Sequence, residues 1–143
     1  MAGMYFEDFE IGQEFRHALS RTVTEMDNTL FSLVTLNPQP LHIDAHFAAT
    51  TEFGTAAVQR PLSLGIMIGM TVYDTTLATP VANLRMTDVT FPRPVFHDDT
   101  LRATARVLSK RESESRPTAG IVEFEHRRST SATRSWANAG APR

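Results

Sequence analysis

The twelve residues from Leu62 to Tyr73 carry no charged side chain, and this run constrains the fold more than any other feature of the chain. Arg60-Pro61 precedes the run, and proline suits the first turn of a helix because the N–H that it lacks has no partner there. A helix that is apolar nearly all round is buried on every side. In a chain of 143 residues, which is one domain's worth, the expected cover is a β-sheet wrapped around this helix.

Four stretches are predicted to form the strands of that sheet, over residues 14–23, 81–95, 100–109 and 120–126. The clearest lies at 100–109, where Leu101 to Val107 alternate between small or apolar and polar side chains. Two prolines within residues 91–95 make that part a bulged or edge segment. Together with the buried helix, these strands predict the α+β fold class.

Short helices are predicted between the first strand and the apolar run. Thr24 and Asp27 can form a capping box, which opens a helix ending near Leu36. The prolines of Asn37-Pro-Gln-Pro40 then end that helix and fix an extended, stiff loop. Asp44 is better placed as the N-cap of a second short helix, over residues 45–53, than as a catalytic carboxylate.

Residues 1–126 are predicted to form the domain, and residues 127–143 a polar, basic tail. The tail contains four arginines and no acidic residue, and its side chains do not alternate as those of a strand do. It is therefore either a poor last strand or a frayed segment.

Charge and composition argue against several classes of partner and site. A net charge of −2 and a pI near 6.2 disfavour a nucleic-acid partner. The absence of cysteine excludes disulfides, cysteine nucleophiles and thiolate metal sites, and it fits a reducing, cytoplasmic location. We expect no membrane partner, because no apolar run reaches 18 residues and the acidic N-terminus is not typical of a signal peptide.

His42 is the strongest candidate for acid–base chemistry, because histidine exchanges protons near neutral pH and two prolines stiffen the segment before it. A structural histidine bonded to loop backbone is the plain alternative. A metal site with Asp44 and His46 is a weaker one. His42 and His46 have helical spacing, but Asp44 lies off that face, so no metal is predicted.

Three motifs together resemble one family. They are Asn37-Pro-Gln-Pro-Leu-His42-Ile-Asp44, Arg60-Pro-Leu-Ser-Leu-Gly65, and a Phe-x-Pro-Val-Phe-x-x-Asp-Thr turn at residues 91–100. Over roughly Tyr5 to His126 the chain resembles the MaoC-like, or (R)-specific enoyl-CoA hydratase, branch of the hot-dog fold. That resemblance implies an antiparallel sheet around a central helix, and reversible addition of water to a 2-enoyl thioester without a metal or redox cofactor. It also implies a homodimer, or a dimer of dimers, with the thioester bound at the subunit interface.

The resemblance assigns roles to individual residues. His42 matches the family's catalytic histidine, and Gly65 the glycine whose N–H binds the thioester oxygen. Asn37 stands where most members have a catalytic aspartate, and Gln39 where they have asparagine. Asparagine cannot accept a proton at neutral pH, so Asn37 and Gln39 are expected to hold the water while His42 acts as base and acid.

The Asn-Pro-Gln-Pro-Leu-His loop is similar to that of mesaconyl-CoA and itaconyl-CoA hydratases, which implies a branched C5 dicarboxylic acyl group. Such a substrate needs a cation for its free carboxylate. Arg60 and Arg93 are the candidates for that carboxylate or for the CoA phosphates, and Pro61 and Ser63 complete the predicted substrate-binding set.

Two rival functions remain. A hot-dog thioesterase would attack the carbonyl, but such enzymes usually carry a carboxylate on the central helix, and this helix offers none before Asp74. A catalytically weak subunit that only binds CoA thioesters is the non-enzymatic rival, and Asn37 is its main support.

Overall fold

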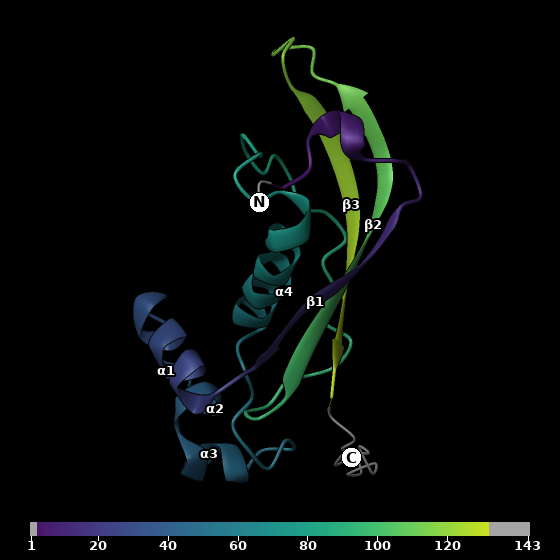
Figure 1. The fold of residues 1–143 in the computed structure, drawn as a ribbon. Helices are drawn as coiled ribbons and strands as arrows, with labels where there is room; N and C mark the ends of the chain where they lie inside the picture. Colours follow the sequence, from purple (N-terminus) through teal and green to yellow (C-terminus); the bar gives the residue numbers. More distant parts are fainter. Residues whose placement is uncertain (1–2, 132–143) are drawn as a thin grey trace. The chain divides into compact units, whose positions relative to one another are not determined.

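The computed structural model describes residues 3–131, which form two compact units (Figure 1). The sheet unit comprises residues 3–21, Leu64–Thr90 and Leu101–Ser129. The helical unit comprises Thr22–Ser63, Phe91–Thr100 and residues 130–131.

The sheet unit is built on three strands in the order β1-β2-β3. They are β1 (Glu14–Thr22), β2 (Thr100–Glu112) and β3 (Gly120–Thr130), and a short 3-10 helix, η1 (Phe6–Asp8), precedes them. Both pairs are antiparallel. Thr22 bonds Thr100 at one end of the β1–β2 pair and Gln13 bonds Val107 near the other, while Ser113 bonds Ala119 across the β2–β3 hairpin. Three of the four predicted strands are thus confirmed.

The alternation predicted for β2 is also confirmed. Its buried side chains are Leu101, Ala103, Ala105 and Val107, and the residues between them are exposed. Phe9 packs its ring edge-on against Phe124 of β3, with ring centroids 5.3 Å apart. The core of the sheet unit therefore lies on one face of the sheet, as period-two burial requires.

Residues 81–95 form no strand, and that prediction is wrong. Val95 accepts a hydrogen bond from Val58, and the neighbouring Phe96 makes an isolated bridge with Ala57. The prolines at 80, 92 and 94 remove N–H donors that a ladder needs. Asp88, with φ at 52°, adds a left-handed turn.

The long helix α4 (Arg60–Thr75) is where the apolar run predicts it. Complete burial of this helix is not observed, however, since Gly65 and Gly69 are exposed and Tyr73 is 67% exposed. Apart from the adjacent residues and the nearby backbone of the helix itself, no described atom lies within 4 Å of where a Cβ of either glycine would stand. Within residues 3–131 three strands accompany α4, and one stripe of the helix is exposed.

The helical unit begins with α1 (Glu25–Val34), which ends two residues before Leu36. The predicted capping box is confirmed, because Thr24 Oγ1 accepts from the Asp27 N–H and the Asp27 carboxylate accepts from the Thr24 N–H. The buried residues of α1 are polar, namely Asn28 and Ser32. Its apolar residues Met26, Leu30, Leu33 and Val34 are all more than half exposed.

Two short helices follow α1. Asn37 to Gln39 form neither helix nor strand, as predicted for the proline loop, but α2 (Pro40–Ile43) begins at the last residue of that loop. Pro40 stands in the first turn of α2, where its fixed φ favours a helix. Asp44 caps α3 (Ala45–Ala49) as predicted, accepting from the Phe47 N–H at 2.9 Å. α3 ends four residues before Phe53 because the hydroxyls of Thr50 and Thr51 bond its last carbonyls.

β3 continues four residues past His126, so the first part of the predicted tail belongs to a strand. The rest of that tail, residues 132–143, lies outside the described residues. Within the described part of the chain, no helix combines the length and apolar character needed to cross a membrane.

Candidate active site

His42 lies on α2 with its ring held in one orientation. Its Nδ1 atom is 2.8 Å from the backbone oxygen of Ala57. A carbonyl oxygen only accepts hydrogen bonds, so Nδ1 carries the proton and the neutral ring has its lone pair on Nε2. The side chain is half-buried. This arrangement is compatible with the predicted role of Nε2 as a base and equally with a structural histidine bonded to backbone, so the catalytic role of His42 stays a prediction.

The segment that receives this ring, residues 56–59, is itself buried and paired on both sides. The Ala57 N–H donates to the Leu41 oxygen at 3.2 Å, and the Val58 N–H donates to the Val95 oxygen at 2.8 Å. The carbonyl that fixes His42 is thus part of a short, closed backbone network rather than a mobile loop.

Asn37 lies just before α2, and two hydrogen bonds fix its amide. Its Nδ2 donates to Oε1 of the buried Gln59 at 2.9 Å, and its Oδ1 accepts from the Gln39 N–H at 3.2 Å. An amide offers two protons and two lone pairs, so one of each remains for a water. Gln39 is exposed and serves as the N-cap residue of α2.

Sequence reasoning missed Asn28, which is fully buried on α1. Its Oδ1 accepts from the Gln59 N–H at 3.0 Å. Its Nδ2 donates to the His42 oxygen at 2.8 Å and to the Ala57 oxygen at 3.1 Å, and lies 3.2 Å from Nε2 of His97. The sequence shows only that Asn28 and Ser32 share one helical face, which does not identify the partners of Asn28.

Gly65 belongs to the sheet unit and is the sixth residue of α4. Only the first four N–H groups of an α-helix lack an intrahelical partner. The helical register is already established at Ser63, whose N–H donates to the Gln59 oxygen. The role of Gly65 as the donor to a thioester oxygen therefore stays a prediction, and the open space beside it is the property that favours close approach of a ligand.

The predicted substrate-binding residues lie in the helical unit. The Arg60 guanidinium stands 5.9 Å from the centre of the Phe91 ring, a cation–π contact that joins the start of α4 to the 91–95 segment. Arg93 and Pro61 are exposed. Ser63 is buried, and its hydroxyl donates to the Arg60 oxygen at 2.9 Å, inside the helix. Contact of these four residues with a substrate stays a prediction.

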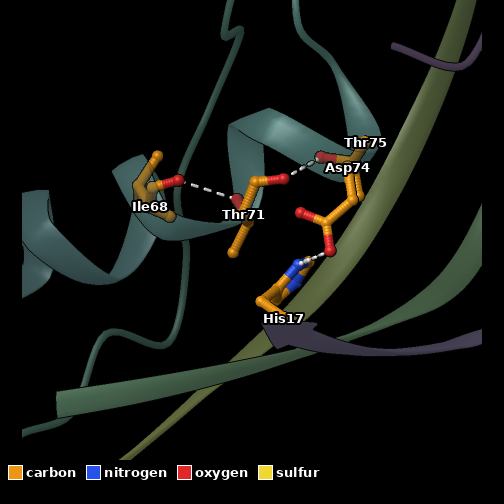
Figure 2. A network of polar contacts seen from close by, with 5 residues as sticks. All are labelled: His17, Ile68, Thr71, Asp74 and Thr75. Atoms are coloured by element: carbon orange, nitrogen blue, oxygen red, sulfur yellow. Dashed lines mark hydrogen bonds and ion pairs between the residues drawn. The ribbon is translucent and has the colours of Figure 1, made fainter. Parts of the chain in front are cut away.

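A second polar cluster lies within the sheet unit (Figure 2). Nδ1 of His17, on β1, is 3.1 Å from the Asp74 carboxylate of α4, and the His17 side chain is wholly buried. On α4, the Thr71 hydroxyl donates to the Ile68 oxygen at 2.8 Å. Burial and then the neighbouring His17 lower the pKa of His126 below the usual value of 6.5. This cluster joins β1 to α4 and includes none of the predicted catalytic residues.

No group of three or more His, Cys, Asp or Glu side chains among residues 3–131 gathers as metal ligands would. His42, Asp44 and His46 are accordingly not such a group.

Comparison with known proteins matches residues 8–128 to a family described as MaoC like domain. The chain is 32% identical over 121 residues to mesaconyl-CoA hydratase of Cereibacter sphaeroides, covering 85% of this chain and 35% of that protein. It is 34% identical over 103 residues to (R)-specific enoyl-CoA hydratase of Rhodospirillum rubrum, covering 72% of this chain and 69% of that protein. The chain thus spans about a third of the length of the first relative.

Among solved structures, the chain superposes with a TM-score of 0.74 on a Mycobacterium tuberculosis protein described as having a double hotdog fold. The two are 24% identical, and the match covers 92% of this chain and 41% of the other. The predicted fold, an α+β hot-dog domain with an antiparallel sheet beside a long helix, is confirmed.

Proposed function

The chain belongs to the MaoC-like domain family, and we propose that it adds water reversibly to the double bond of a 2-enoyl-CoA thioester. The observation that carries the proposal is the hydrogen bond from His42 Nδ1 to the Ala57 oxygen, which leaves Nε2 as the base. The relatives named mesaconyl-CoA hydratase and (R)-specific enoyl-CoA hydratase support the reaction class. No metal or redox cofactor is part of the proposal.

In the proposed reaction, His42 Nε2 accepts a proton from water while the water oxygen bonds to C3 of the enoyl group. The π electrons of the C2–C3 bond move onto the thioester as an enolate, which Gly65 is proposed to stabilise through its N–H. The imidazolium then returns the proton to C2. Water has been added across the double bond, and His42 ends in its starting form.

Asn37 and Gln39 are proposed to hold the water. The Asn37 amide keeps one proton and one lone pair beyond its bonds to Gln59 and Gln39. Because an amide does not accept a proton at neutral pH, a single imidazole carries out both transfers in this proposal.

The proposed substrate class is a short, branched acyl group with a free carboxylate, of the mesaconyl-CoA or itaconyl-CoA type. The relative named mesaconyl-CoA hydratase supports it. The Arg60 guanidinium, whose contact with the Phe91 ring orders it, is the proposed partner for the carboxylate or the CoA phosphates, together with Arg93, Pro61 and Ser63.

We further propose that the chain forms a homodimer, with further association of dimers left open. The open stripe of α4 at Gly65, Gly69 and Tyr73 supports a second hot-dog domain as its cover.

One rival is favoured by a specific observation. Asn37 in place of a carboxylate favours a subunit that binds CoA thioesters without turnover. The thioesterase has no comparable support, because the first acid of α4, Asp74, is paired with His17.

A hydration assay with crotonyl-, mesaconyl- and itaconyl-CoA tests the proposal, following the loss of enoyl-thioester absorbance. We expect turnover that is fastest on a C5 dicarboxylic thioester, and a loss of at least about 10²-fold in His42→Ala. Turnover of crotonyl-CoA alone would keep the reaction and reject the dicarboxylic substrate. Tight binding of all three without turnover would favour the binding subunit.

A further inference from the structure

We propose that Asn28 is a positioning residue for His42, fixing both the backbone of α2 and the carbonyl that orients the imidazole. The proposal rests on the proposed role of His42 as the base. It assigns Asn28 no contact with the substrate.

One buried amide reaches three separate segments of the helical unit. The Asn28 side chain bonds the His42 oxygen on α2 and the Ala57 oxygen and Gln59 N–H on the buried segment, and its Nδ2 lies 3.2 Å from Nε2 of His97 in the turn before β2. Asn28 itself is fully buried on α1. No other single side chain described here joins α1, α2 and these two segments at once.

The orientation of this amide is determined by its partners. The Gln59 N–H can only donate, so the atom facing it is Oδ1. The oxygens of His42 and Ala57 can only accept, so the atom facing them is Nδ2. A flipped amide would place its oxygen against two carbonyl oxygens. The two carbonyl oxygens take both Nδ2 protons, so the 3.2 Å contact with Nε2 of His97 does not assign the tautomer of that ring.

Asn28 and His42 meet at one acceptor. The Ala57 oxygen receives Nδ2 of Asn28 at 3.1 Å and Nδ1 of His42 at 2.8 Å, which uses both of its lone pairs. The second Asn28 bond holds the backbone oxygen of His42. The Asn28 amide therefore holds the backbone of His42 directly and the Nδ1 atom of its ring through the Ala57 oxygen. A change at Asn28 should displace the ring, although Asn28 does not bond the ring itself.

The test is Asn28→Asp, which keeps the size of the side chain and removes both donated protons. We expect kcat to fall by about 10- to 100-fold, because a small displacement of a catalytic group is that costly. KM should stay within about threefold, because no substrate contact is lost. Asn83→Asp, on an exposed stretch of the sheet unit, adds the same charge and should leave both constants unchanged.

A readout that does not depend on activity separates positioning from a general loss of structure. In ¹⁵N spectra of the histidine rings, with the His42 signals assigned by their loss in His42→Ala, the wild-type ring should show a protonated Nδ1 and an unprotonated Nε2. Asn28→Asp should give a mixture of the two tautomers. If Asn28→Asp fails to fold by circular dichroism, Asn28→Ser, which keeps one donor, undergoes the same measurements with the same expectations.

A folded variant with unchanged kcat, or with reduced kcat and an unchanged His42 tautomer, would overturn the proposal. Wild-type protein without hydratase activity would instead reject the proposed function. The tautomer comparison would then still decide whether Asn28 orients His42.

Discussion

At the scale of single residues, the surroundings of Asn37 determine what a carboxylate would do in its place. Asn37 Nδ2 donates to Gln59 Oε1 at 2.9 Å, so Asn37→Asp sets two oxygens against each other. We expect a loss of about 1–3 kcal/mol in the free energy of unfolding. We expect no gain in kcat, because the proposed mechanism already assigns the base to His42 Nε2. Urea unfolding and steady-state kinetics on the same preparation measure both quantities.

Asn83→Asp is the matched control for Asn37→Asp, since it makes the same chemical change on an exposed residue of the sheet unit. A gain of tenfold or more in the activity of Asn37→Asp would contradict the expectation. It would mean that the wild-type chain lacks its proton acceptor, and it would favour the binding subunit.

The residues of the candidate site differed in how far the sequence could predict them. His42 was predictable as a candidate, because its proline-stiffened motif is uncommon and histidine has the only unperturbed side-chain pKa near neutrality, and its role as the base stays a prediction. Asn28 was not, because an asparagine within a helix is usually a solvated side chain, and its partners lie 14, 29, 31 and 69 residues away in the chain. Only tertiary structure brings these groups together.

At the scale of elements, β3 carries a histidine whose pKa makes the stability of the protein depend on pH. Burial, with a smaller contribution from His17, lowers the pKa of His126 below 6.5. As pH falls below about 6.5, the unfolded chain takes up a proton at this position before the folded chain does. The contribution of His126 to the free energy of unfolding therefore falls as pH drops from about 6.5 to the lowered pKa. Below that pKa, the contribution no longer changes with pH.

His126→Gln removes this titration, so its stability should fall less than that of the wild type between pH 7 and pH 5, as measured by urea unfolding at each pH. The comparison needs the slope with pH rather than the stability at one pH, because His126 also stacks on Phe124. His46→Gln, on the exposed surface of α3, serves as the control. If the free energy of unfolding changes equally with pH in wild type and His126→Gln, another group causes the loss of stability between pH 7 and pH 5.

Whether a helix or strand forms was easier to predict than which of its faces is buried. Thr24, Asp27 and Asp44 determined two helix starts because capping is a local interaction. The apolar residues of α1 gave the right helix but not its orientation, since the buried face is occupied by Asn28 and Ser32 and their polar partners. For residues 81–95, apolar content suggested a strand that the prolines there prevent.

At the scale of the whole molecule, the apolar run of α4 predicted a helix buried on all sides, and the described part of one chain buries only some of it. Gly65, Gly69 and Tyr73 recur every four residues, so they form one exposed stripe along the helix. The uncharged run thus predicted the position of the helix correctly, and its burial would be completed only by an element outside the described part of one chain. A second copy of the chain is the cover that we propose.

Gly69→Arg tests this cover. Within one chain, no described atom outside the adjacent residues and the nearby helix backbone lies within 4 Å of a Cβ at Gly69, so a side chain there meets no other element. It should also favour the helix by up to about 1 kcal/mol, because glycine is a poor helix former. If a second copy packs on this stripe, the new side chain and charge lie in the interface, and sedimentation velocity should show monomers where the wild type gives dimers. Thr87→Arg, on an exposed loop of the same unit, should sediment as the wild type does. A Gly69→Arg protein that remains dimeric would place the interface elsewhere and leave the open face of α4 without the proposed cover.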